Sequence, residues 1–337
     1  MANRYHAIMT RLSADWSEGH WLRGLVVLIT VAMMAIVVTV FHEQTMVVPE
    51  VGAVTTGLIF FQIDEWRKGP IPFYLVICGA AFLGVEVARY LPVDLIAQIV
   101  ITLAAILGAI LFFRVPAFPA LSAGLLPVYL HLVSPLYVVA VIVFMGLPIL
   151  FVVITERPGL GPASPIPVTL RSTIIIVGSL GTMVLAVWLV HSPLAVLPPL
   201  FVAAVENANA PKARGVRQLS WTALAILGAI ELTILLFLTL NSNFVVLVTI
   251  LLTLVLVTRF AIESPPILAL AIIPIVFNHA NDVHISYLIL IGIALSQIAP
   301  PLVASATDAA IALLGSDRSS ATDYDRIEAD FDLDNRA

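Results

Sequence analysis

The feature that most constrains this chain is a series of twelve apolar runs, separated by short stretches rich in Pro, Gly, Asn or charge. A helix of about 20 apolar residues crosses a bilayer, and it pairs its own backbone groups where no water can reach them. The runs therefore predict an all-α, polytopic membrane protein with about 12 transmembrane segments. We place the segments at residues 22–41, 47–62, 71–90, 93–113, 118–132, 135–154, 170–190, 194–206, 219–240, 244–260, 262–279 and 286–305.

Composition supports this prediction and excludes several classes of protein. Of the 337 residues, 61% are hydrophobic and 11% are charged, whereas soluble domains are about half apolar and a quarter charged. The net charge of −5 provides no broad basic surface for nucleic acid. No P-loop, H-E-x-x-H helix or G-x-S-x-G elbow is present. We therefore expect no enzymatic activity, no cofactor, no bound metal and no nucleic-acid partner.

The distribution of basic residues predicts the orientation. Cytoplasmic loops of membrane proteins collect Lys and Arg. With the N-terminus inside, all of the 16 basic residues except Arg89 fall on the cytoplasmic side. We therefore expect a multi-pass protein of the plasma (inner) membrane with both termini in the cytoplasm. The five tryptophans lie at segment ends, which is typical of an aromatic belt at the membrane surface: Trp16, Trp21, Trp66, Trp188 and Trp221.

The two halves of the chain repeat one pattern of prolines. Pro49 is matched by Pro198 at an offset of 149 residues, and the spacing of eight from Pro119 to Pro127 recurs from Pro266 to Pro274 at an offset of 147. We interpret this as a degenerate tandem duplication, with the repeats inserted the same way up because each has six spans. The predicted organisation is an interfacial amphipathic segment (1–21), a first repeat (22–155), a Pro/Gly linker (156–169), a second repeat (170–306) and an acidic, disordered tail (307–337).

Short or Pro-containing segments occupy matching positions of the two repeats. The second, fifth and eighth segments are shorter than a full span, and the second, fifth, eighth and eleventh all contain proline. Such broken helices line the binding sites of transporters, although proline also simply kinks tilted helices, and a short segment could re-enter rather than span. The candidate site prolines are Pro49, Pro119, Pro127, Pro198, Pro199, Pro265, Pro266 and Pro274.

Ionisable residues at membrane depth are also candidates, because burying a charge in lipid is costly. Glu231 lies midway along the ninth segment and is either a proton-coupling group or a protonated acid in an interhelical hydrogen bond. Glu50 and Glu206–Asn207 flank the short segments, as gating or coordinating groups or as solvated helix-end residues. Arg114 and Arg259 either attract an anion or only anchor the inner membrane face.

Small residues at a spacing of four mark the third segment. Ala80, Gly84 and Ala88 form a small-xxx-small ladder, which allows two helix backbones to approach closely. We interpret this ladder as a packing feature rather than as part of a site.

Two stretches resemble the HPP family of integral membrane proteins. Residues 261–274 read AIESPPILALAIIP, similar to the family's His-Pro-Pro helix, and residues 117–127 repeat the pattern more weakly. The basic loop after the eighth segment, around Lys212, also resembles the family. The signature His is replaced by Ser264 in one repeat and by Phe118 in the other. Some HPP members are linked to nitrite transport, and a similar six-helix unit occurs in the fusaric acid resistance family of aromatic acid exporters.

These features together predict a secondary transporter or facilitator for a small anion, nitrite-like or carboxylate, with proton coupling as one option. An anion channel, an intramembrane enzyme and a non-transporting membrane subunit are the alternatives. The expected partners are the lipid bilayer and a small anionic solute, and a homo-oligomer is compatible with the sequence.

Overall fold

Long apolar helices dominate the computed structural model, which describes residues 20–41, 43–156, 169–192, 195–208, 228, 244–259, 265–276 and 290–312. The regular structure in this part of the chain is helical, without strands. Five helices are long and apolar enough to cross a membrane, so the protein is membrane-embedded. They are α5 (Pro70–Tyr90), α6 (Leu95–Phe113), α8 (Leu136–Glu156), α9 (Leu170–Val190) and the C-terminal helix (Leu290–Ala312).

Two further apolar helices accompany these five. They are α2 (His20–Phe41), with an apolar stretch from Leu22 to Val38, and α12 (Phe244–Arg259). The helices agree with the predicted segments to within a few residues at each end. Most of the predicted interfacial segment, the linker from 157 to 168, nearly all of the ninth segment and the tail beyond 312 lie outside the described residues.

Four short helical elements form the centre of the molecule. The first is α3 (Glu50–Thr55), continued by the π-helical turn η2 (Thr56–Phe60), and the others are α7 (Pro119–Leu130), α10 (Pro198–Ala208) and α13 (Pro266–Val276). Every residue of α3 and η2 is buried, as is α7 from Pro119 to Tyr129. The long helices bury only 33–44% of their most apolar stretch. A helix too short to span lipid leaves its terminal backbone groups at membrane depth, where only surrounding protein can shield them.

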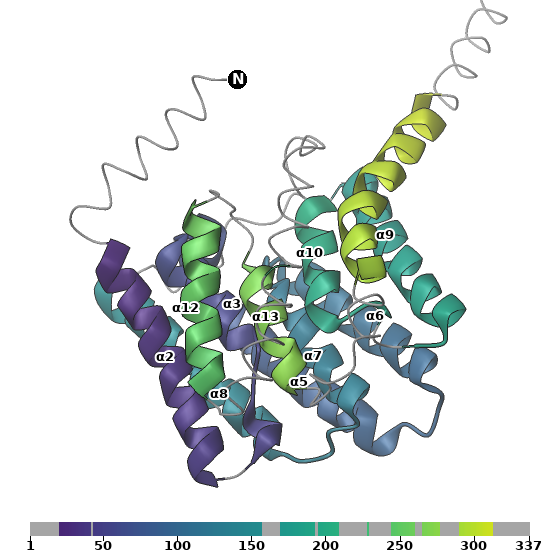
Figure 1. The fold of residues 1–337 in the computed structure, drawn as a ribbon. Coiled ribbons are helices and arrows are strands. Elements are labelled where there is room, and N and C mark those ends of the chain that lie inside the picture. Colours follow the sequence, from purple (N-terminus) through teal and green to yellow (C-terminus); the bar gives the residue numbers. More distant parts are fainter. Residues whose placement is uncertain are drawn as a thin grey trace, which may run out of the picture.

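The short helices close a ring. Helix α3 packs against α7, α7 against α10, α10 against α13, and α13 against α3. The longer helices flank this ring, with α2 packed on α12 and α6 packed on α9. Figure 1 shows α2 and α12 at one side of the short helices, and α9 with the yellow C-terminal helix at the other.

The predicted small-residue ladder is a close packing of α5 on α7. A Cβ atom built on Gly84 would overlap the carbonyl group of Gly124. A Cβ atom built on Gly124 would lie 2.9 Å from the carbonyl oxygen of Ala80. The two backbones therefore touch, which confirms the packing interpretation of the ladder.

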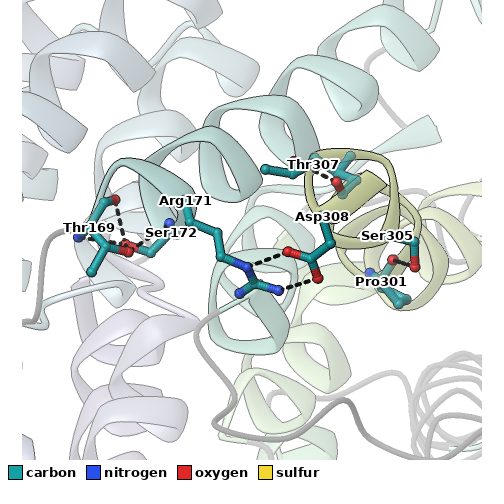
Figure 2. Close-up of polar contacts among 8 residues, drawn as sticks. Thr169, Arg171, Ser172, Pro301, Ser305, Thr307 and Asp308 are labelled. Atoms are coloured by element: carbon teal, nitrogen blue, oxygen red, sulfur yellow. Dashed lines mark hydrogen bonds and ion pairs between the residues drawn. The ribbon is translucent and has the colours of Figure 1, made fainter. Parts of the chain in front are cut away.

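Two ion pairs tie distant segments together at helix ends. Arg67, in the short helix α4 (Asp64–Arg67), pairs with Glu156 at the end of α8. Arg171 near the start of α9 donates to both carboxylate oxygens of Asp308, at 2.6 and 2.7 Å (Figure 2). Thr307 donates its hydroxyl hydrogen to the carbonyl of Val303 in the same turn. The C-terminal helix continues to Ala312, past residue 306, so the first residues of the predicted disordered tail are helical, which corrects that prediction.

We expect the Arg171–Asp308 pair to contribute little stability. Both side chains are about half exposed, and exposed ion pairs are weakened by water and salt. Arg171→Ala should shift the melting temperature only slightly, and 1 M NaCl should remove the shift. Arg67→Ala should have the larger effect, because the Arg67 side chain is only 18% exposed. A large loss of stability in Arg171→Ala would show instead that this pair is needed to dock the C-terminal helix.

Candidate functional site

A small cavity lies where the first turns of the four short helices meet. Each helix contributes two residues spaced by three, which places both on one helix face. The cavity is also lined by Trp66, Glu206 and Pro265. The paired lining residues are Glu50 and Ala53 from α3, Pro119 and Ser122 from α7, Pro199 and Val202 from α10, and Pro266 and Ala269 from α13.

The sequence offsets of the two halves reappear in this lining. Glu50 is 149 residues from Pro199, and Ala53 is 149 residues from Val202. The lining residues of α7 are likewise 147 residues from those of α13. The polar pair formed by Glu50 and Ser122 thus corresponds to Pro199 and Ala269, so the two sides of the cavity differ in chemistry.

Glu50 is the most unusual side chain of the cavity. It is the first residue of α3, it is 1% exposed, and its Oε1 atom accepts a hydrogen bond from the Ser122 hydroxyl. Its Oε2 atom is buried and has no hydrogen-bond partner among the described residues. A buried carboxyl group with one unsatisfied oxygen is costly. Such a group therefore needs either a proton or a ligand at Oε2.

The backbone around the cavity contributes positive potential but few free donors. The N-terminal end of a helix carries a partial positive charge of about half a unit, and α7, α10 and α13 each present this end to the cavity. Prolines at the first positions lack an N–H group. Several neighbouring N–H groups bond within the first turn: Val51 to Val48, Leu121 to Phe118, Leu200 to Leu197 and Leu268 to Pro265. Specific hydrogen bonds must therefore come from the side chains.

The cavity is nearly closed in this conformation. The volume open to the centre of a water-sized molecule is about 10 Å³, close to the minimum for one water. Trp66 closes one side. It is 3% exposed, and its ring lies 5.0 Å from that of Phe73. Trp66 was expected in the aromatic belt, which is wrong: α4 packs against α5 and η2, and the Trp66 ring is buried there. Trp188, by contrast, is 55% exposed.

The structure separates the other candidate residues into several groups. Pro49 and Pro198 are buried next to the cavity-lining residues of their helices, and Pro127 lies buried inside α7. Asn207 is half-buried and donates its side-chain N–H to the carbonyl of Ser296, so it joins α10 to the C-terminal helix. Glu231 lies outside the described residues, as do the side chains of Arg259 and Pro274.

Arg114 does not reach the cavity. It is the C-cap of α6, its backbone is left-handed with φ of 53°, and it is exposed. Among the described residues, therefore, no cationic side chain lines the cavity. The sequence-based hypothesis that Arg114 concentrates anions applies to the surface, not to this space.

Sequence reasoning missed Ser122, Ala53, Val202 and Ala269. One available signal was the spacing of three from each marked residue, since Ser122 follows Pro119 by one helical turn. The hydrogen bond between Ser122 and Glu50 joins residues 72 positions apart. No local pattern encodes that pairing.

Comparisons with known proteins provide no family assignment. No family model, no curated protein and no solved structure matches the chain.

Proposed function

We propose that this protein is a secondary transporter or facilitator that binds a small anion in the cavity at the centre of the short-helix ring. The observation that carries the proposal is the convergence of four first turns on one buried, partly polar space. Broken helices with their positive ends toward a shared site are the arrangement by which membrane transporters hold anionic groups without lipid contact. The resemblance to the HPP family suggests the same substrate class.

We further propose that twelve segments form two parallel repeats of six. The matched helix contacts support this: α2 on α3 corresponds to α9 on α10, and α2 on α12 corresponds to α9 on α6. Likewise α3 on α13 corresponds to α10 on α7, and α6 on α7 to α12 on α13. In every pair of contacts, exchanging the first repeat for the second turns one contact into the other. The cavity would therefore lie on a pseudo-twofold axis that relates the two repeats.

The proposed depth of the cavity follows from helix length. Residues 50–60 are helical over about 16 Å at 1.5 Å per residue, about half of a hydrocarbon core of about 30 Å. With a cytoplasmic loop at residues 61–69, α3 would begin near the midplane. The Ser122–Glu50 hydrogen bond would then place the start of α7 at the same depth. A site at the midplane is accessible from either side in turn.

The nearly closed cavity favours a carrier over a channel. A carrier passes through occluded conformations, and a site with room for about one water must widen before even a small anion enters. The Ser122 hydroxyl and the Glu50 carboxyl group form a hydrogen-bonded pair in the lining. The space beside them has room for about one water, so an intramembrane enzyme acting on a larger substrate has less support. A plasma-membrane location with both termini inside remains part of this proposal.

A small cation is a second candidate substrate. Glu50 and Glu206 are the ionisable side chains that line the cavity among the described residues, and carboxylates attract cations. The positive helix ends oppose this attraction. Measurements with anions and cations at the same ionic strength distinguish the two candidates.

We expect a small anion to stabilise the purified protein. A ligand that binds only the folded state at 100 times its Kd adds about 2.7 kcal/mol of stability. Melting temperatures in detergent should be measured with sodium salts of nitrate, nitrite, formate and benzoate, then with chloride salts of Li⁺, Na⁺, K⁺ and Cs⁺. A saturable rise with one anion, followed by flux of that anion into proteoliposomes, is the expected result.

A cavity-filling variant provides the control. Ala53→Leu adds bulk to the lining and should remove the anion-dependent rise, whereas Gly181→Leu, where a Cβ has no neighbour within 4 Å, should retain it. A rise with cations only would favour the second candidate. Absence of both stabilisation and flux would favour a non-transporting subunit.

A further inference from the structure

We propose that Glu50 is the proton-binding group of the cavity, and that it carries a proton on Oε2 whenever an anion occupies the site. This inference rests on the proposed function and names its coupling ion. The observations behind it are the burial of Glu50, the single hydrogen bond from Ser122 and the unpartnered Oε2 atom.

The hydrogen bonding of Glu50 fits the protonated form. An ionised carboxylate offers about four acceptor sites, and here the Ser122 hydroxyl is the side-chain donor to Oε1 of Glu50, while Oε2 has no partner within the described residues. A proton on Oε2 converts the unsatisfied acceptor into a donor. That O–H group would lie at the surface of the cavity, where it can donate to a bound anion.

The charge balance of the cavity leads to the same conclusion. An ionised Glu50 and a bound anion would be two like charges in one small, poorly hydrated space, and like charges disfavour each other's ionised form. The step is a simple protonation: before the anion enters, a hydronium ion on the side to which the cavity opens gives its proton to Oε2, which forms the O–H bond and leaves water. The O–H bond breaks and the proton returns to water when the anion leaves on the other side. No electrons are transferred.

Within the described residues, few other titratable groups face Glu50. Tyr137 of α8 lies within electrostatic reach, and its hydroxyl donates to the carbonyl of Ala123 at 2.9 Å. Glu206 of α10 lines the same cavity. The lining residues of α7 and α13 are proline, serine and alanine. The position that corresponds to Glu50 in the second half is Pro199, which cannot titrate, so we infer one proton per anion from this pair of positions.

Infrared spectroscopy tests the proton site without any substrate. Wild-type protein in liposomes should show the C=O stretching band of a protonated carboxyl group, lost on titration to alkaline pH. Glu50→Gln should remove this band, and it keeps an Oε1 acceptor for Ser122. Ser122→Ala should retain the band at higher frequency, because the hydrogen bond to the carbonyl oxygen is lost. Glu86→Gln, outside the cavity lining, is the matched control and should leave the band unchanged.

Nitrate provides the transport test. It remains ionised across the pH range of a proton-gradient experiment, so it has no neutral form that crosses lipid unaided. With an inward proton gradient, proteoliposomes that contain the wild-type protein or Glu86→Gln should accumulate nitrate to a higher concentration than passive equilibration would give. In Glu50→Gln, nitrate should not rise above the equilibrium level at any gradient.

The outcomes separate the two proposals. A carboxyl band that persists unchanged in a folded Glu50→Gln protein, or gradient-driven accumulation in that variant, would overturn the role of Glu50. A band that depends on Glu50 without flux of any anion in the wild type would leave Glu50 as the proton site and overturn anion transport.

Discussion

Replacement of Gly84 by alanine is expected to destabilise the protein by up to about 3 kcal/mol, the upper part of the range for overpacking a core. The added Cβ would overlap the backbone carbonyl of Gly124, and a backbone group cannot move aside as a flexible side chain can. Helices α5 and α7 would have to separate. Because α7 is part of the ring around the cavity, ligand binding should weaken together with stability.

Gly79 provides a matched control on the same helix. A Cβ built on Gly79 has no neighbour within 4 Å, so Gly79→Ala should cause no loss. Thermal unfolding in detergent, followed by circular dichroism, compares the two variants. Equal stability of Gly84→Ala and Gly79→Ala would contradict the close backbone contact between α5 and α7.

Labelling of single cysteines is expected to show on which side of the membrane each position lies, because each cysteine is either labelled or protected in intact cells. Cys78 is the sole cysteine, so Cys78→Ser supplies the background for Glu65→Cys, Tyr90→Cys and Val133→Cys, whose native side chains are exposed. A membrane-impermeant maleimide added to intact cells should label the cysteines at 90 and 133. The cysteine at 65 should react only after the cells are permeabilised.

The same experiment decides whether α7 spans or re-enters. Helix α7 and the residues that lead into it, 115–118, lie between the exposed residues Arg114 and Val133. If α7 re-enters, the cysteine at 133 will be protected while the cysteine at 90 stays accessible. If the cysteine at 65 is labelled in intact cells while those at 90 and 133 are protected, the chain is inserted the other way up.

Local sequence patterns predicted the helices well, because each feature involved is short-range. The apolar runs set the positions of α5, α6, α8 and α9 to within two residues. The eighth segment was predicted at residues 194–206, and α10 begins at Pro198 instead, since proline at the start of a helix needs no N–H partner. The C-terminal helix ends at Ala312, later than the predicted end at residue 305.

The candidate site was predictable only in part. Repetition of prolines pointed to Pro119, Pro199 and Pro266, which meet at the cavity. The role of Glu50 was not separable from that of other acids, since its burial and its partner Ser122 arise from packing between helices. Arg114 was chosen for its charge and its position near a segment end, but its side chain is exposed and does not line the cavity.

The sequence by itself determined that this chain is a membrane protein of apolar helices with broken segments at matching positions of its two halves. Hydropathy and proline act within one or two turns, so they can be read along the chain. The tertiary structure alone decided that the broken segments close a ring, that Ser122 faces Glu50, and that one carboxyl oxygen of Glu50 is buried without a partner among the described residues. These facts depend on side chains brought together from residues 50 to 269, and burial and hydrogen bonding there follow from helix packing.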